Sequence, residues 1–288
     1  MDNGFEIDVI PDDCSIDMRP NDTSDPFRIF ISIPKKSPPP RGWPFLVLTD
    51  GNATFPFAQA CLVTQAPHTN ETNIDWGVIV AIGYPVDDPY DPFRRSWDLS
   101  PPPGKTYPPF YPGAEPVRTG GADMLLDFIA EKLLPKIAEM TRIDPERGTL
   151  FGHSFGGLFT LFALFRQPDL FKNWVSASPS IYWEEEEILE VERSRRPARA
   201  SKPFLHLSAG EYEAVTLAPF ERLGTDAAER LKARQIEKTV VLAQDMAKRL
   251  NGAADGLEAR FELFADETHM SVLAPAINRS IKIAFSKG

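Results

Sequence analysis

The residues most able to do chemistry in this sequence surround Ser154. The segment 151–157 contains the pattern Gly-x-Ser-x-Gly, in which Gly152 and Gly156 flank the serine. A short apolar run of β type precedes the motif and a helical pattern rich in Leu and Phe follows it, which is the strand–turn–helix setting that this motif requires. Small neighbours give a tightly turned serine the room it needs. The pattern predicts a nucleophile at Ser154; the alternative is an incidental serine in a glycine-rich loop.

A nucleophilic serine needs an imidazole that takes its proton. Two histidines follow Ser154 in the chain, His206 and His269. His206 lies inside an apolar run, so we expect a packed strand residue there. His269 lies in a polar loop between the last predicted strand and the last predicted helix, where an α/β sheet assembles its site. We therefore predict His269 as the base, against the alternative of a surface histidine, and expect His153 to be a packing or hydrogen-bonding residue.

An acid that orients the imidazole should follow the strand before the long helical pattern. That strand leads into Gly210, followed by Glu211 and Glu213. Strand alternation predicts that both carboxylates lie on the same side, so spacing does not choose between them. The alternative is that both are solvated loop residues.

The oxyanion of an acyl-transfer reaction needs preorganised N–H donors. The backbone N–H of Phe155, at the start of the helix after Ser154, is the first predicted donor, because a helix N-terminus favours negative charge. The second predicted donor is the backbone N–H of Asn52, which follows an early strand and Gly51. For the second donor, an ordinary Asp-Gly turn is the alternative.

Short apolar runs alternate with helical periodicity along the chain, which predicts a mostly parallel sheet with helices on both faces. The two earliest runs are joined by a connection too short for a crossover helix, so we expect them to pair antiparallel. The predicted strands are 28–33, 44–48, 77–82, 149–152, 173–177, 203–207 and 259–264, and the predicted helices are 122–141, 155–166, 226–250 and 272–285.

Bulk properties narrow the classes of function. The chain has 288 residues and a formal net charge of −10, which disfavours nucleic acid and anionic membranes as partners. We find no signal peptide and no apolar run long enough to span a membrane. Two cysteines are too few for a disulfide framework, which predicts a cytoplasmic protein. Histidine and cysteine spacing predicts no metal site, we expect no cofactor, and no pattern specifies an oligomer.

We expect one domain over residues 1–288, because no repeat or low-complexity linker divides the chain. The segment 184–200 begins with four glutamates and continues with several arginines. Such a run predicts a solvated helix whose charges neutralise one another, and the alternative is a lid that leaves the sheet.

With these residues in view, the chain resembles the esterase D-type esterases of the α/β-hydrolase superfamily, and within them the siderophore esterases similar to ferric enterobactin esterase. The resemblance covers most of the chain. The segments that carry it are Leu-Thr-Asp-Gly-Asn at 48–52, Ala-Ile-Gly-Tyr at 81–84, Arg-Ser-Trp-Asp-Leu-Ser-Pro at 95–101, Phe-Gly-His-Ser-Phe-Gly-Gly-Leu-Phe at 151–159, Ser-Ala-Ser-Pro-Ser-Ile-Tyr-Trp at 176–183 and Asp-Glu-Thr-His-Met-Ser-Val at 266–272.

The resemblance implies an α/β-hydrolase fold with antiparallel N-terminal strands, and a serine esterase that cleaves a small-molecule carboxylic ester or lactone through an acyl-enzyme. It implies Ser154 and His269 as the reacting pair, and Glu213 as the acid in a Gly-x-x-Glu element, although some siderophore esterases work with a serine–histidine pair. Arg95 and Asp98 match a family motif near the pocket. We expect them to form a structural ion pair, and the alternative is that they contact the substrate.

A ferric catecholate siderophore is anionic, so the arginines of 193–196 are candidates for attracting it. Two other functions fit the same sequence. An acyltransferase or thioesterase would use the same Ser–His site, and a non-catalytic binding module would keep the pocket without the chemistry.

Overall fold

A computed structural model describes residues 12–22, 24–198, 202–251 and 256–287. Its centre is an eight-stranded sheet in the order β1-β2-β4-β3-β7-β8-β9-β10. The strands are β1 Asp12–Met18, β2 Phe27–Ile33, β3 Trp43–Leu48, β4 Val78–Gly83, β7 Ile143–His153, β8 Asn173–Ala177, β9 Phe204–Gly210 and β10 Glu258–Phe264. From β4 to β10 all neighbours are parallel, whereas β1 and β2 pair antiparallel.

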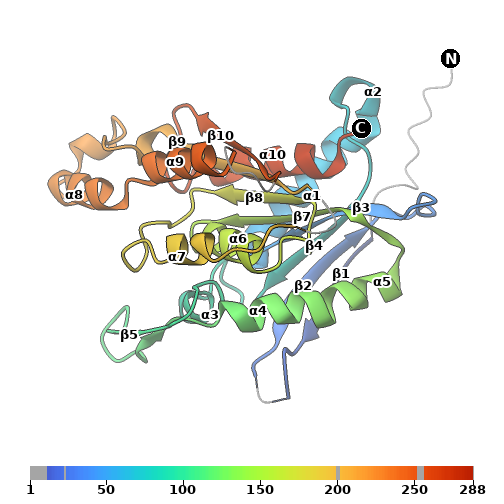
Figure 1. Ribbon diagram of the computed structural model, residues 1–288, viewed down its shortest axis with the longest axis horizontal. Helices are drawn as coiled ribbons and strands as arrows, with labels where there is room; N and C mark the ends of the chain where they lie inside the picture. The colour runs from blue at the N-terminus through green and yellow to red at the C-terminus, as the bar shows by residue number, and fades with distance from the viewer. Residues whose placement is uncertain (1–11, 23, 199–201, 252–255, 288) are drawn as a thin grey trace.

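Helices cover both faces of this sheet, and Figure 1 shows the two helical layers on either side of it. Helices α1 Gly51–Gln65, α9 Thr239–Asn251 and α10 Leu273–Phe285 lie on one face. The other face carries α4 Ala122–Phe128, α5 Leu134–Met140, α6 Phe155–Arg166 and α7 Ile188–Arg193. The predicted α/β-hydrolase arrangement, a mostly parallel sheet with antiparallel N-terminal strands, is confirmed.

The remaining elements are short or lie at the edges: α2 Thr69–Thr72, α3 Pro92–Asp98, α8 Ala227–Glu237, the one-turn helices η2 Ala66–His68, η4 Glu211–Glu213 and η5 Glu221–Leu223, and the hairpin of β5 Thr106–Tyr107 with β6 Val117–Arg118. Among the residues described, no helix has the length and apolarity needed to cross a bilayer.

The predicted antiparallel pairing of 28–33 with 44–48 is wrong. The strand β2 pairs with β1 and β4, and β3 lies between β4 and β7 as a parallel strand. All six residues of β3 are buried, as a strand covered on both faces requires, whereas β2 mostly alternates between buried and half-buried residues. The position of each strand in the sheet therefore agrees with the burial of its side chains, and not with the shortness of the loop that joins β2 to β3.

Two predicted helices are interrupted. The pattern over 226–250 forms α8 and α9, which are separated at Lys238 with a φ of 45°. The pattern over 122–141 contains a π-helical turn at Ile129–Leu133 just before Pro135. A proline inside a helix cannot donate a hydrogen bond and crowds the carbonyl four residues earlier, and a π turn relieves that conflict.

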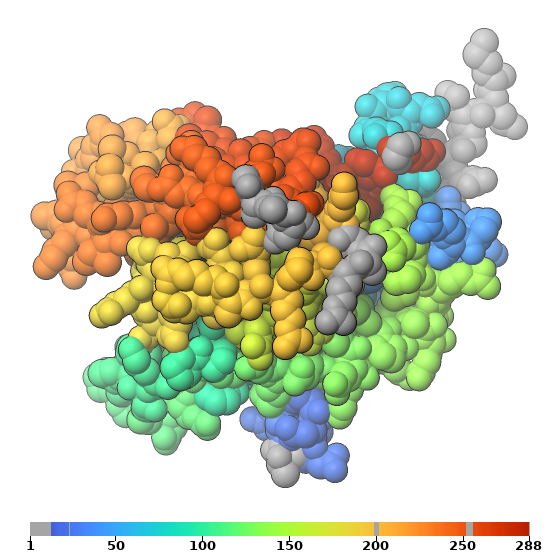
Figure 2. Space-filling view, in the orientation of Figure 1, coloured from blue at the N-terminus to red at the C-terminus, as the bar shows by residue number. Residues whose placement is uncertain are grey.

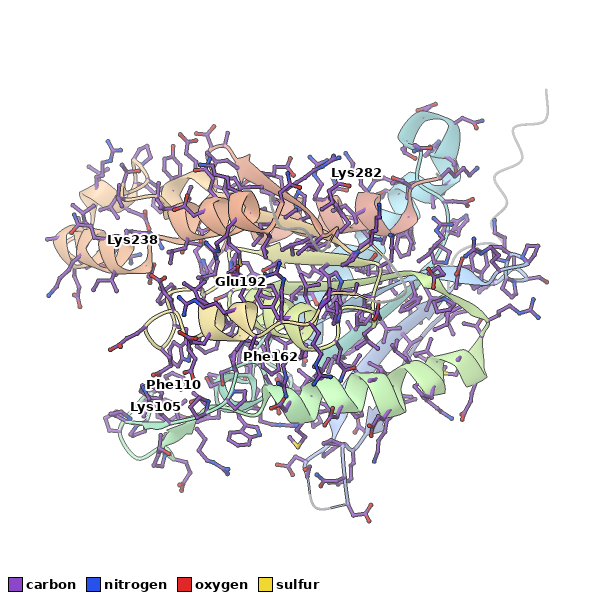
Figure 3. All side chains as sticks on the ribbon, in the orientation of Figure 1. Lys105, Phe110, Phe162, Glu192, Lys238 and Lys282 are labelled. Atoms are coloured by element: carbon purple, nitrogen blue, oxygen red, sulfur yellow. The ribbon has the colours of Figure 1, made fainter. Side chains whose placement is uncertain are left out.

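The segment 184–200 packs on the body of the protein instead of forming a solvated helix; its last two residues lie outside the described ones. Ile188 and Glu192 of α7 are buried. The Glu192 carboxylate accepts hydrogen bonds of 2.9 and 2.6 Å from Arg249 of α9, and Figure 3 labels Glu192 near this contact. An arginine that is 57 positions away in the chain therefore compensates its charge.

Candidate active site

Ser154 stands on the sharp turn between β7 and α6. Its φ of 59° and ψ of −117° are sparsely populated for a residue with a side chain, so the surroundings must hold it there. A Cβ at Gly152 would lie 1.9 Å from the carbonyl oxygen of Gly156, and a Cβ at Gly156 would lie 2.3 Å from Thr49 Oγ1. Both flanking glycines are therefore required by close packing around the serine.

His269 reaches Ser154 from the loop that follows β10. Its Nε2 lies 3.1 Å from Ser154 Oγ. His153 contacts this loop through a hydrogen bond: its Nε2 donates to the backbone oxygen of His269, which lies 2.7 Å away. Burial, together with the nearby His269, lowers the pKa of His153 to about 3, so His153 adds no charge beside His269. The expected hydrogen-bonding role of His153 is confirmed.

Glu213 lies behind His269 and is fully buried in the one-turn helix η4. Its Oε2 is 2.6 Å from His269 Nδ1, and its Oε1 accepts hydrogen bonds of 2.8 Å from the Gly210 N–H and 2.5 Å from the Ser178 hydroxyl. Burial by itself would raise the pKa of Glu213, but these hydrogen bonds outweigh it and the pKa is lowered. An ionised Glu213 can only accept, so His269 carries its proton on Nδ1 and presents a lone pair on Nε2 to Ser154.

Glu211 does not lie on the same side as Glu213, contrary to the alternation expected for a strand. The chain turns into η4 directly after Gly210, and Glu211 is exposed. Its carboxylate accepts a hydrogen bond of 2.9 Å from the backbone N–H of Asp266. The structure thus brings Glu213, and not Glu211, to the imidazole.

His206 is a buried residue of β9, as expected, and does not approach Ser154. Its Nε2 lies 3.0 Å from Glu262 Oε2 on the neighbouring strand β10.

A turn at 177–180, after β8, joins the nucleophile to the acid, and the sequence analysis gave it no role. The Ser154 N–H donates to Ala177 O at 3.0 Å, and the Ser180 N–H donates to Ser154 O at 3.3 Å. The Ser180 hydroxyl lies 3.5 Å from Ser154 Oγ, and Ser178, with a φ of 44°, bonds Glu213. The string Ser-Pro-Ser after an apolar strand is the signal that could have found it.

The two predicted oxyanion donors stand at the N-termini of two helices, where the first N–H groups have no acceptor within the helix. Phe155 is the first residue of α6 and Asn52 the second of α1. The Asn52 side chain is fully used: its Oδ1 accepts from the Tyr84 N–H at 2.9 Å, and its Nδ2 donates to the backbone oxygens of Tyr84 at 3.1 Å and Val86 at 2.9 Å. The end of β4 thus fixes the start of α1.

Arg95 and Asp98 do not form the expected ion pair with each other, because each has another partner. The Arg95 guanidinium makes two hydrogen bonds, 2.9 and 3.1 Å long, to Asp50, which begins α1. Asp98 lies 3.9 Å from Arg94 instead, and burial raises its pKa to about 7 despite that arginine. Asp98 also lines a cavity of about 680 Å³ with Phe93 and Trp97, and Ser154, His269 and Glu213 are not part of its lining.

Arg195 and Arg196 lie away from Ser154, which argues against the expectation that they attract a substrate to it. Arg193 pairs with Glu190 on its own helix. Arg195 and Arg196 lie against Pro203 and Leu257, just before the first residues of β9 and β10. Ser154 follows the last residue of the parallel strand β7, and a seven-residue strand spans roughly 20 Å. Arg195 and Arg196 therefore lie at the opposite end of the parallel strands from Ser154.

Groups of three or more His, Cys, Asp or Glu side chains arranged to hold a metal ion are absent from the residues that the structure describes.

Comparison with known proteins places this geometry in a family. A family model described as "Putative esterase" matches residues 21–248. The chain belongs to this esterase family. It is therefore a hydrolase that acts on esters. The matched residues include Ser154 and Glu213 and end before His269.

The relatives of this esterase include proteins named for siderophores. It is 32% identical over 267 residues to the ferri-bacillibactin esterase BesA of Bacillus subtilis, covering 90% of this chain and 84% of the relative. It is 37% identical over 247 residues to a siderophore enterobactin esterase of Emericella nidulans, covering 81% and 79%. The solved siderophore hydrolase EstA from Aspergillus nidulans matches with a TM-score of 0.79 and 31% identity over 95% of this chain and 93% of that one.

Proposed function

We propose that this esterase is a serine hydrolase that opens the ester bonds of a siderophore trilactone through an acyl-enzyme on Ser154. The observation that carries the proposal is the continuous line of hydrogen bonds from Ser154 Oγ through His269 to the buried carboxylate of Glu213, with distances of 3.1 and 2.6 Å. The names of the relatives support the choice of substrate.

In the proposed reaction, Ser154 Oγ attacks the ester carbonyl while its proton passes to His269 Nε2. The imidazolium is stabilised by ionised Glu213 at Nδ1. The N–H groups of Phe155 and Asn52, at the positive ends of α6 and α1, would stabilise the oxyanion. His269 then returns the proton to the leaving alkoxide, and a water molecule, activated by the same imidazole, releases the acid from Ser154.

The deciding experiment is Ser154→Ala, assayed on p-nitrophenyl acetate and on methyl butyrate. We expect kcat to fall by about 10⁴-fold or more, since removal of a nucleophile of this type leaves only binding and oxyanion stabilisation. Ser194→Ala, at the exposed end of α7, is the matched control and should keep full activity. An organophosphorus fluoride should label the wild type on Ser154, as located by mass spectrometry. Full activity in Ser154→Ala would refute the proposal.

We also propose a cytoplasmic location, which rests on the presence of only two cysteines, too few to form a disulfide framework. Fractionation of cells that make the protein tests this, and recovery from the medium or an extracytoplasmic compartment would contradict it.

A further inference from the structure

A second hydroxyl, that of Ser180, lies beside the oxygen of the nucleophile. Ser180 Oγ is 3.5 Å from Ser154 Oγ, and Ser180 is only 1% exposed. The Ser180 N–H donates to the backbone oxygen of Ser154 at 3.3 Å, and the Ser180 backbone oxygen accepts from the Trp183 N–H at 3.0 Å. Backbone hydrogen bonds therefore hold Ser180 in place on both sides, and its hydroxyl is left over for another task.

The protons of the site fix the direction of the contact between the two hydroxyls. His269 carries its proton on Nδ1, where ionised Glu213 accepts it, so His269 Nε2 can only accept. The single proton of Ser154 Oγ points to that nitrogen, 3.1 Å away. Ser154 Oγ has no second proton to give. In its contact with Ser180, the Ser180 hydroxyl is therefore the donor and Ser154 Oγ is the acceptor.

The phenol of Tyr182 lies next to the Ser180 hydroxyl. Burial and then the charge of Glu237 raise the pKa of Tyr182, and the Ser180 hydroxyl acts in the opposite direction. Because the pKa is raised overall, the phenol keeps its proton at neutral pH and can donate to Ser180. Figure 2 shows the segment that carries Tyr182, in yellow, against the segment of α8, in orange, where Arg234 donates to Glu237 at 3.2 Å. The tyrosine is thus held between α8 and the active site.

We infer that Ser180 is a catalytic residue, whose hydroxyl donates to Ser154 Oγ and speeds the release of the acyl group from the enzyme, and that Tyr182 positions this hydroxyl. The inference rests on the proposed function, because it concerns the same acyl-enzyme. All donors then run in one direction, from Tyr182 through Ser180, Ser154 and His269 to Glu213. Hydrogen bonds in such a chain polarise and strengthen one another.

The step that gains most from this donor is the departure of Ser154 from the acyl group. A water molecule attacks the carbonyl carbon of the acyl-enzyme and gives a proton to His269 Nε2. The bond between that carbon and Ser154 Oγ then breaks, its electron pair stays on Oγ, and His269 returns the proton to Oγ. The Ser180 hydroxyl stabilises the negative charge that builds up on Oγ, and its own proton stays on Ser180 throughout.

The same hydrogen bond does not favour formation of the acyl-enzyme. In the free enzyme Ser154 Oγ is a hydroxyl oxygen, and acylation converts it to an ester oxygen, which is a poorer acceptor. The Ser180 donor therefore stabilises the free serine more than the acylated one. A distance of 3.5 Å is long for an O–H···O bond in the resting enzyme, and hydrogen bonds to reacting atoms tighten as charge develops. The contact therefore stabilises the transition state more than the ground state.

The variant Ser180→Ala tests this assignment, because it deletes the hydroxyl and keeps the N–H that bonds Ser154. With p-nitrophenyl acetate, stopped-flow absorbance measures the release of p-nitrophenolate in the first turnover, and mass spectrometry after acid quenching follows the loss of the acetyl group. We expect deacetylation to slow by about 10-fold and the first-turnover rate to change by less than about twofold, as one neutral hydrogen bond allows. Equal slowing of both steps, or no change in either, would overturn the role of Ser180.

The variant Ser176→Ala is the matched control for the loss of a buried hydroxyl. Ser176 is fully buried on β8, and its hydroxyl donates to the backbone oxygen of Gly157 at 2.8 Å. This variant should lower the urea midpoint and leave the ratio of the two rates unchanged. If it shifts the ratio as much as Ser180→Ala does, a general loosening of the site is responsible, and the inference fails.

The variant Tyr182→Phe tests the positioning role, since it removes the phenolic donor and keeps the ring. We expect deacetylation to slow by about threefold when Ser180 is present, and by much less in the Ser180→Ala background, because residues that act through one another are not additive. The first-turnover rate should again stay nearly constant. Equal slowing in the two backgrounds would show that Tyr182 does not act through Ser180.

Failure of the proposed function has a different signature. The serine hydrolase proposal falls if Ser154→Ala keeps full activity on p-nitrophenyl acetate, or if the trapped acetyl group is found on a residue other than Ser154. If the acetyl group forms on Ser154 and leaves at the same rate with and without the Ser180 hydroxyl, only the role of Ser180 is lost.

Discussion

At the scale of single residues, the carboxylate behind His269 is the most informative part of the site. Glu213 and Glu211 are two positions apart, yet one is fully buried and the other exposed. Glu213 accepts hydrogen bonds from His269, Gly210 and Ser178, and these three donors stabilise its negative charge. Such a carboxylate can fix the tautomer and orientation of an imidazole, which an exposed one cannot do as well.

The two glutamates form a matched pair for experiment. Glu213→Gln should lower kcat on p-nitrophenyl acetate by roughly 10²–10⁴-fold, because a neutral amide neither fixes the tautomer nor stabilises the imidazolium. Glu211→Gln should change kcat by less than about twofold. Urea unfolding of both variants provides the check that each is folded. Equal losses in the two variants would exclude Glu213 as the specific partner of His269.

At the scale of elements, the turn at 177–180 after β8 sets the geometry of two reacting groups at once. Its backbone bonds Ser154 on both sides, and the Ser178 hydroxyl bonds Glu213. Gly157 of α6 allows this close approach, since a Cβ there would lie 2.8 Å from Ala177 O and 3.1 Å from Pro179 Cα. The turn therefore connects the nucleophile Ser154 to the acid Glu213 through hydrogen bonds of its own.

Removal of the Ser178 hydroxyl tests this coupling. Ser178→Gly keeps a residue that tolerates the φ of 44° and deletes only the side chain. We expect kcat to fall by roughly 10-fold with KM nearly unchanged, because a buried oxygen of Glu213 loses one of its donors, and stability to fall by about 1–3 kcal/mol. Steady-state kinetics and urea denaturation measure the two effects. A change in KM alone would show that Ser178 acts on substrate binding and not through Glu213.

Helix α3 is a second element that carries charged side chains with separate partners. Arg95 contacts Asp50 and the ring of Phe155. Asp98 is buried near Tyr84 and Arg94. Burial raises the pKa of Asp98 to about 7 from an ordinary value of 3.8. In the folded protein Asp98 therefore keeps its proton between about pH 4 and pH 7, where the unfolded chain has lost it.

This difference has a defined sign for stability. Because the folded state binds more protons in that window, the free energy of unfolding should decrease as pH rises from about 4 to about 7 and then level off. About three pKa units at about 1.4 kcal/mol each set a ceiling of about 4 kcal/mol. Subtracting the pH profile of Asp98→Asn from that of the wild type isolates the contribution of this residue. If the stabilisation by Asp98 increased instead as pH rises, the charge of Arg94 would outweigh burial and Asp98 would be ionised in the folded protein.

At the scale of the whole molecule, we propose that the chain is one domain. One cluster of buried apolar side chains extends from Phe27 on β2 to Phe285 on α10. The segment 184–198 joins it through Ile188 and through the pairing of Glu192 with Arg249, so α7 is part of this body rather than a detached lid.

One domain predicts one cooperative unfolding transition. Tryptophan fluorescence and far-ultraviolet circular dichroism should give the same urea midpoint, since the five tryptophans are spread from Trp43 to Trp183 and the helices continue to Phe285. Two separated transitions, or probes that disagree, would indicate that the N-terminal and C-terminal parts unfold independently.

The sequence by itself determined the features that depend on near neighbours in the chain. The glycines around Ser154, the helix 155–166 and the loop position of His269 follow from patterns a few residues long, because turns and helices are set by contacts within one or two turns. The sequence pattern also predicted a mixed sheet, although the antiparallel pair on which that prediction rested is not formed. The resemblance to a family favoured Glu213 over Glu211.

Tertiary structure decided the features that depend on distant partners. Three such features are the insertion of β3 between β4 and β7, the pairing of Arg95 with Asp50, and the hydrogen bond from Ser178 to Glu213. The residues that they join are more than 30 positions apart in the chain. Burial of apolar strands and satisfaction of buried charges select such contacts, and neither leaves a local pattern. For the same reason the arginines of 193–196 looked suited to an anionic substrate in the sequence. In the fold, Arg195 and Arg196 lie beside the first residues of β9 and β10, at the opposite end of the strands from Ser154.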